Sequence, residues 1–357
     1  MRPPRQRTRN GHGTPSTAVA SAIRKRIVEG EFVPGSQLPT WDAMGAEYGV
    51  GRNTLVRAIE QLKQQRFIYA ASTRGTYVVD RPPHLFNYVL LFHDKPGHEE
   101  WSQFYWALAN QSVEIQEQRN CRITARYGVQ NERDNDPHER LLREVATDQY
   151  AGVIFVGNPD RISTQCLMMS SLPKVAICGR SDRFQLPDVD IDRSSFVRKA
   201  VDFLASRGRR KIAVLSHYHD PVLKGLGEAI QQKGLEYRPH WMLPATALLP
   251  ETANPIIRLL LSAAQPEQPD ALIIANDNLV DEALAAVVAL GKRVPEDLEI
   301  VTHCNWPTPK GHVIHTHRLG YDVRRMLREC IQVIDDWRAG KETPECVRTP
   351  ALFENEL

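Results

Sequence analysis

The apolar positions in the first part of the chain recur with the period of short amphipathic helices. Three helices are predicted, over residues 17–29, 40–48 and 51–65. The apolar stripe of the third helix is formed by Leu55, Ile59 and Leu62. Three short helices with a tight turn before the last one have the spacing of a helix-turn-helix. Ser16 or Thr17 is expected to cap the first helix.

Two short runs rich in aromatic and β-branched residues follow the third helix. Residues 67–71 and 76–79 are predicted to form a hairpin, and its connection ends at Gly75, which permits a positive φ. A hairpin directly after a helix-turn-helix makes a winged helix. Arg74, at the tip of this hairpin, is placed to enter a minor groove or to contact phosphate.

The outer face of the third helix carries side chains that can read DNA. Arg52, Asn53, Thr54 and Arg57 lie away from its apolar stripe. Arginine can pair with guanine and asparagine with adenine, while threonine can bond phosphate or touch a thymine methyl group. A solvated helix face is the alternative interpretation of this helix taken alone.

The pattern changes after the consecutive prolines at residues 82–83, which are expected to make a stiff, extended spacer. Near-continuous apolar strands then alternate with helices, which predicts parallel sheets covered on both faces. The alternation restarts after residue 192, so two α/β lobes are expected, with ligand groups at the carboxyl ends of their strands. The expected strands are residues 87–92, 122–127, 151–156, 174–178, 211–215, 240–243, 271–275 and 299–302.

These patterns predict a multidomain protein, an α+β winged helix followed by a two-lobe α/β domain. A late helix over 321–338 and a strand over 346–353 are expected to return across the hinge between the lobes. The expected parts are a disordered basic tail (residues 1–15), the winged helix (16–80), a Pro-rich linker (81–86) and the two-lobe domain (87–357).

Charge is distributed unevenly between the two parts of the chain. Residues 1–83 hold 13 Lys and Arg against 6 Asp and Glu, a net +7, so the rest holds 32 basic and 37 acidic residues, a net −5. A basic front on a mildly acidic body is typical of a polyanion-binding module attached to another domain. No long apolar run or secretory signal is evident, so a cytoplasmic protein with reduced cysteines is expected.

Three motifs in order resemble the GntR family of bacterial transcription regulators. They are Pro34-Gly35-x-x-Leu38-Pro39-Thr40, Gly51-Arg52-Asn53-Thr54 and Arg74-Gly75-Thr76-Tyr77-Val78. The chain departs from the family where Gly51 replaces a serine and where Val56 replaces an arginine, with Arg57 one position later. The resemblance implies double-stranded DNA as a partner and contacts from Thr40, Arg52, Asn53, Thr54, Arg57, Arg74, Gly75 and Thr76.

The second part of the chain, about residues 87–353, resembles the periplasmic-binding-protein-like sensor of the LacI/GalR family. The resemblance is carried by segments 150–154, 189–192, 208–213, 269–277 and 294–301. A GntR-type reader joined to this sensor is similar to the arabinose-repressor-like branch. That similarity implies a homodimeric regulator, more often a repressor, controlled by a small sugar-like effector, with no cofactor.

The polar residues that sugar-binding members use are not present at the corresponding positions. Gly179, Val222 and Cys304 stand where the family has an aspartate, an arginine and an aspartate. Either the ligand is not an ordinary neutral sugar, or other side chains bind it. The candidates are His93, Arg180, His219, Asp220, Asn276, Asp277, His303, Asn305 and Arg318. Arg180 and Arg318 together would suit an anionic metabolite.

Other constellations give weaker hypotheses. His312, His315 and His317 are not expected to bind zinc, because they lack a fourth ligand and do not share one face of a strand. An enzyme with a two-lobe catalytic domain and an accessory nucleic-acid module is the alternative function, but no nucleophile and base are paired at strand ends. A DNA-compacting protein with a degenerate sensor is a third interpretation.

Overall fold

The computed structural model describes the chain except for residues 1–13, 72–73, 131–135, 163–164, 182 and 218–220. Most of the predicted tail therefore lies outside the described residues. The described chain forms two compact units, one of residues 1–88 with 139–152 and the other of residues 89–138 with 153–357. No described helix is long and apolar enough to span a membrane.

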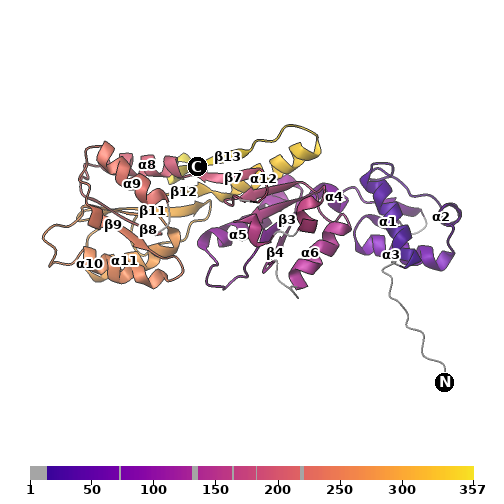
Figure 1. Cartoon of the computed structure of the whole chain (residues 1–357), viewed down its shortest axis with the longest axis horizontal. Coiled ribbons are helices and arrows are strands. Elements are labelled where there is room, and N and C mark those ends of the chain that lie inside the picture. Colours follow the sequence, from indigo (N-terminus) through magenta and orange to yellow (C-terminus); the bar gives the residue numbers. More distant parts are fainter. Residues whose placement is uncertain (1–13, 72–73, 131–135, 163–164, 182, 218–220) are drawn as a thin grey trace, which may run out of the picture. The chain divides into compact units, whose positions relative to one another are not determined.

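The first unit contains the three predicted helices (Figure 1), α1 (Pro15–Val28), α2 (Trp41–Tyr48) and α3 (Arg52–Gln64). The expected N-cap of α1 was wrong. Thr14 caps this helix, because Pro15 lacks an N–H and fits the first helical position. Thr40 caps α2, as expected for a threonine directly before an apolar helical pattern. Its hydroxyl accepts a hydrogen bond from the Ala43 amide.

The core of the winged helix is built from the apolar stripes of these helices and from the wing. Strands β1 (Ile68–Ala71) and β2 (Gly75–Val78) pair antiparallel and cover the helices with one face. Trp41 is half-buried against this core. The fully buried members include Ile23, Met44, Leu55, Ile59, Leu62, Phe67 and Val78.

A buried arginine on α1 joins three segments of the first unit. Arg24 is 5% exposed and donates hydrogen bonds to Asp148 Oδ2 at 3.0 Å, Gln65 Oε1 at 3.1 Å and Ser21 Oγ at 3.3 Å. Asp148 follows α6 (Asp136–Ala146), far along the chain. Because a buried guanidinium needs a charged partner, this ion pair ties the winged helix to the segment after α6.

The expected extended spacer between the two parts was wrong. Pro82 is extended, but Pro83 begins a helical turn, α4 (Pro83–Phe86). Proline suits the first position of a helix, since the N–H that it lacks has no helical partner there.

The second unit contains a mixed, mostly parallel sheet that runs through both lobes. The described strands have the order β4-β3-β5-β6-β7-β13-β12-β11-β10-β8-β9. They are β3 (Asn87–Phe92), β4 (Arg122–Arg126), β5 (Gly152–Val156), β6 (Lys174–Ile177), β7 (Asp188–Asp192), β8 (Ile212–His217), β9 (Met242–Ala245), β10 (Ala271–Ile274), β11 (Glu299–Trp306), β12 (His317–Asp322) and β13 (Cys346–Phe353). This confirms the predicted two-lobe α/β fold.

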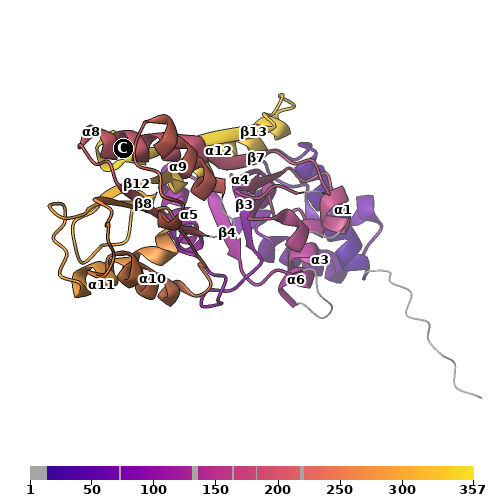
Figure 2. The ribbon, with the colours of Figure 1, turned by 60° about the vertical axis from the view of Figure 1, so that its left-hand side comes forward.

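Helices cover both faces of each lobe (Figures 1 and 2). In the second lobe α8 and α9 lie on one face and α10 and α11 on the other, where they pack against the apolar side chains of β8 and β10. The remaining helices are α5 (Gln103–Arg119), α7 (Gln165–Met169), α8 (Arg193–Ser206), α9 (Pro221–Gln232), α10 (Ala253–Leu260), α11 (Val280–Ala289) and α12 (Val323–Arg338).

Two expectations for this sheet differ from the structure. The pattern also predicts a helix over 160–170, but among the described residues its start lies in a 3-10 turn (Pro159–Arg161) and its α-helical part is the short α7. The late helix was predicted to begin at residue 321, but α12 begins at Val323. Residues 321 and 322 belong to strand β12, which the pattern did not predict.

Strand β13 joins the two lobes and decides which of their edges face each other. It runs parallel to β7, with Pro350 opposite Asp192, and antiparallel to β12, with Ala351 opposite Tyr321. The carboxyl ends of β7 and β12 therefore meet at adjacent residues of β13. The Tyr321 hydroxyl donates to the Asp192 carbonyl at 3.4 Å across this junction. The edges at which the strands of the two lobes end consequently face one another.

Replacing Arg24 with methionine is expected to lower the free energy of opening of α1 by about 1–3 kcal/mol, because bonds to Gln65 and Asp148 are lost. Hydrogen exchange of the α1 amides, followed by mass spectrometry, measures this change. Lys25→Met is the matched control, since the exposed pair of Lys25 with Glu29 should contribute little. Equal exchange in both variants would mean that the Arg24 contacts do not stabilise this unit.

Candidate functional site

The amino end of α3 presents donors and cations to the outside of the winged helix. Arg52, Asn53 and Arg57 are exposed and Thr54 is half-buried, so these four predicted reading residues are accessible. Gly51, the N-cap, forms no side-chain capping bond, and the first turn contains no acidic residue. The positive end of the helix dipole is therefore not neutralised by the protein, which suits a phosphate or a base edge.

Two further predicted DNA-binding residues differ in accessibility. Thr40 is exposed, although its hydroxyl already caps α2. Thr76 is only 7% exposed, because Thr76 and Val78 point to the core side of the wing while Tyr77 points outward. The Thr76 side chain is therefore less accessible to DNA than the other predicted contacts, and its contact with DNA stays a prediction.

The tip of the wing is held in place by a residue that the sequence patterns did not single out. Gln37 Nε2 and the Tyr77 hydroxyl both donate to the Arg74 carbonyl, at 2.9 and 3.0 Å. Gly75 has φ 110°, and a Cβ there would lie 2.6 Å from Gln37 Nε2. The positive φ favours glycine at position 75, and a Cβ there would displace the Gln37 amide from its bond to Arg74. Arg74 is exposed at this tip, in agreement with its predicted place.

A cavity of about 220 Å³ lies where the carboxyl ends of the two lobes meet. Its size suits a small metabolite rather than a drug-sized ligand, for which pockets of roughly 300–1,000 Å³ are usual. Both lobes contribute to the lining. The described residues that line it are Ser102, Phe104, Cys178, Ile191, Phe196, Val222, Ala275, Asn276, Asp277, Asn278, His303, Asn305 and Tyr321.

Four of the nine predicted effector residues come together in this cavity. They are Asn276 and Asp277, which follow β10, and His303 and Asn305 on β11. The last two share one side because β11 continues through Trp306, so that alternate side chains point the same way. The sequence patterns had ended this strand at Thr302.

A network of polar side chains is centred on Asp277. The Asn305 amide donates to Asp277 Oδ2, and His303 Nδ1 lies 3.7 Å from Asp277 Oδ1. Asn276 Oδ1 accepts from both the backbone and the side-chain amide of Asn278, at 3.0 Å each. Asn305 Oδ1 is buried and has no hydrogen-bond partner among the described residues. This carbonyl is therefore available to a hydroxyl or amine donor of a ligand.

The remaining predicted effector residues lie elsewhere. His93, Arg180 and Arg318 do not line this cavity, and Arg180 is exposed. His219 and Asp220 lie outside the described residues. Among the described lining residues there is no lysine or arginine, while Asp277 contributes a carboxylate. An anionic ligand held by Arg180 and Arg318 is therefore not supported by this cavity.

Several residues that line the cavity were not among the effector candidates selected from the sequence. Ser102 and Phe104 lie at the start of α5, and Tyr321 lies on the unpredicted strand β12. Phe196 and Val222 provide apolar surface from α8 and α9. The aromatic spacing at residues 101–106 could have indicated a ligand-stacking segment, but it is equally typical of a buried helix face.

The glycine at position 179, where the sugar-binding family has an aspartate, follows from backbone packing. A Cβ on Gly179 would lie 1.7 Å from the Gly157 carbonyl oxygen. No side chain fits without a backbone shift, so the aspartate of the family is excluded here by steric contact.

Comparison with known proteins gives two matches along the chain. Residues 15–78 match the gntR family of bacterial regulatory proteins, and residues 201–353 match the periplasmic binding protein-like domain. The chain therefore combines a GntR-type helix-turn-helix with a periplasmic-binding-protein-like domain.

Similar full-length proteins are transcription regulators by name. Catabolite control protein A of Streptococcus mutans is 28% identical over 178 residues, which cover 48% of this chain and 52% of that protein. This chain thus spans about half of that relative. The arabinose metabolism transcriptional repressor of Geobacillus stearothermophilus is 23% identical over 301 residues, covering 77% of this chain and 78% of the repressor.

The fold is that of solved LacI-type regulators. The structure of the transcriptional regulator CelR in complex with cellobiose is similar with a TM-score of 0.58 and 22% identity, covering 88% of this chain and 98% of that one.

Substitution of Arg52 by alanine is expected to weaken binding to a specific operator by about 1–3 kcal/mol, since a bidentate base contact is lost. The operator would be selected from random-sequence DNA with the wild-type protein, and fluorescence anisotropy at physiological salt would measure affinity. Gln64→Ala, exposed at the other end of α3, is the control and should bind as wild type. Unchanged affinity of Arg52→Ala would mean that another element enters the groove.

Introducing alanine at Gly179 is expected to lower the free energy of unfolding by at least about 2 kcal/mol, because Gly157 must move. Thermal unfolding measures the loss. Gly311→Ala is the matched control, since a Cβ at Gly311 meets nothing within 4 Å and should leave the melting temperature nearly unchanged.

Proposed function

We propose that this chain, which joins a GntR-type reader to a periplasmic-binding-protein-like sensor, is a transcription repressor controlled by a small polyhydroxylated metabolite. The observation that carries the proposal is the pairing of an exposed, basic recognition helix with a cavity between two lobes that contains the polar side chains of Asn276, Asp277, His303 and Asn305. Arg52, Asn53 and Thr54 read the operator, with Arg57 in the same exposed face. Arg74 contacts the DNA from the wing.

The chemistry of the cavity favours a neutral ligand with several hydroxyl groups. Asp277 and the free carbonyl of Asn305 accept hydrogen bonds, while Asn276 and Asn278 supply further amides. A carboxylate without a nearby lining cation would repel a phosphate or an acid. Phe104 and Phe196 add apolar surface of the kind that covers the C–H faces of a sugar ring.

The similar proteins support this class of ligand. One relative is named for arabinose metabolism, and the CelR structure contains cellobiose. The departures at Gly179, Val222 and Cys304 mean that the hydroxyl-binding groups of this chain are not those of the wider family. His303 and Asn305, from the extended strand β11, take their place.

Control of DNA binding follows from the two-lobe architecture. A ligand that contacts both Phe104 of the first lobe and Asp277 of the second stabilises one relative position of the lobes. In a homodimer that binds two half-sites, such a change alters the spacing of the two recognition helices and releases the operator. A protein that reads the chromosome in this way would work in the cytoplasm.

A neutral sugar or polyol is expected to raise the melting temperature of the protein and to weaken operator binding at least tenfold. Sugars, sugar acids and sugar phosphates would be screened by thermal shift, and the hits tested by anisotropy with the selected operator. Asp277→Asn and Asn305→Ala should lose the response but keep basal operator affinity, because both residues lie in the cavity.

Asp336→Asn is the matched control. Asp336, on α12, forms an ion pair with Lys341 and does not line the cavity. If only sugar acids or sugar phosphates stabilised the protein, the proposal of a neutral ligand would be wrong. Operator binding that no metabolite alters would instead favour a DNA-compacting protein.

A further inference from the structure

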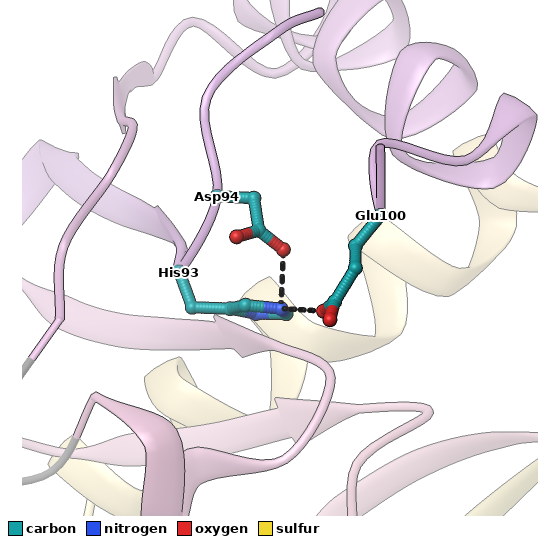
Figure 3. Close-up of side chains that lie close together, drawn as sticks. All are labelled: His93, Asp94 and Glu100. Carbon is teal, nitrogen blue, oxygen red and sulfur yellow. Dashed lines mark ion pairs between the residues drawn. The ribbon is translucent and has the colours of Figure 1, made fainter. Parts of the chain in front are cut away.

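Three side chains that can bind a metal converge at the carboxyl end of β3, outside the lining of the cavity (Figure 3). His93 and Asp94 follow this strand, and Glu100 reaches them from the segment before α5. His93 Nε2 lies 2.7 Å from Asp94 Oδ2 and 3.7 Å from Glu100 Oε2. One atom from each of the three residues lies within 4.8 Å of the other two.

Three polar atoms of the two buried members of this cluster lack a hydrogen-bond partner among the described residues, while Asp94 Oδ1 lies 3.5 Å from His98 Nδ1. His93 and Asp94 are each 2% exposed. Neither nitrogen of His93 nor Oδ2 of Asp94 has a hydrogen-bond partner among the described residues, because their 2.7 Å contact does not have hydrogen-bond geometry. Two electron-pair donors that approach so closely without a shared proton repel each other, unless a cation lies between them.

Arg161 contacts the third member of the cluster. Its guanidinium donates to Glu100 Oε2 at 2.6 Å. The same carboxylate oxygen lies 3.7 Å from His93 Nε2.

The net charge also favours a cation. Asp94 and Glu100 contribute two negative charges, and Arg161 contributes one positive charge. The three side chains therefore carry a net charge of −1, which attracts a cation, and a divalent ion would bring the total to +1. Arg161 can stay on Glu100, since a carboxylate offers about four lone-pair positions.

We propose that His93 Nε2, Asp94 Oδ2 and Glu100 Oε2 bind one divalent transition-metal ion of the Zn²⁺ or Mn²⁺ type. Around an ion with metal–ligand distances of about 2.1 Å, neighbouring ligand atoms are about 3.0–3.4 Å apart. This range lies between the 2.7 Å from His93 Nε2 to Asp94 Oδ2 and the 3.7 Å from His93 Nε2 to Glu100 Oε2. One imidazole with two carboxylates is a mixed donor set suited to these ions.

The ion would fix the segment that supplies part of the effector cavity. Glu100 lies two residues before Ser102 and four before Phe104, both of which line that cavity. Binding Glu100 to His93 and Asp94 therefore anchors this segment to the end of β3. With three protein ligands, the remaining positions are open to water.

The histidines at 312, 315 and 317 provide the internal comparison. His317 bonds Glu299 at 3.1 Å and the rings of His315 and His317 are perpendicular, with centroids 5.2 Å apart. His312, His315 and His317 do not form a convergent ligand cluster among the described residues.

Isothermal titration of the untagged, metal-stripped full chain with Zn²⁺ and with Mn²⁺ tests the site. The wild type should bind one ion per chain, with a raised melting temperature. His93→Gln and Glu100→Gln should each weaken binding at least tenfold. Glu100 is 38% exposed, so its variant keeps the test valid if the buried His93→Gln variant unfolds.

A His312→Gln/His315→Gln double variant is the matched control and should bind the ion as the wild type does. Co²⁺ serves as a spectroscopic probe, and its visible absorption should change on binding to wild type but not to Glu100→Gln. The proposal is overturned if the wild type binds no ion, if Glu100→Gln binds equally well, or if only the double variant loses binding.

Discussion

The pairing of strand β13 is the constraint on which the second unit depends. Its first residues run parallel to β7 and its last residues run antiparallel to β12, so the lobes have opposite strand directions. The carboxyl ends of both parallel sheets therefore face each other beside Pro350 and Ala351. Side chains at these ends need not be packed into a sheet, and they are free to bind a ligand. The cavity is a consequence of this register.

The same sheet geometry decides which polar groups enter the cavity. Strand β11 extends through Trp306, whose indole donates to the Leu352 carbonyl of β13 at 2.9 Å. That extension places His303 and Asn305 on one side with Asp277. On the first lobe, contact between Gly179 and Gly157 leaves no room for a side chain. The polar side chains that line the cavity therefore come mainly from the second lobe.

In the winged helix, positions are fixed by polar contacts around an apolar core. Gln37 and Tyr77 hold the carbonyl of Arg74, whose side chain is exposed. Arg24 joins α1 to Gln65, at the end of α3, and to Asp148. The recognition helix is consequently fixed at its carboxyl end, while its amino end remains open to a groove.

The sequence by itself determined the element types, because helix and strand periods, caps and turns are local. It predicted α2 with its Thr40 cap, the limits of β3 and β13, and the exposed face of α3. Tertiary structure alone decided the length of β11, the existence of β12 and the burial of Thr76. It also excluded Arg180 and Arg318 from the cavity and brought Glu100 to His93. These outcomes depend on strand register and on contacts between segments distant in sequence, and no local period encodes them.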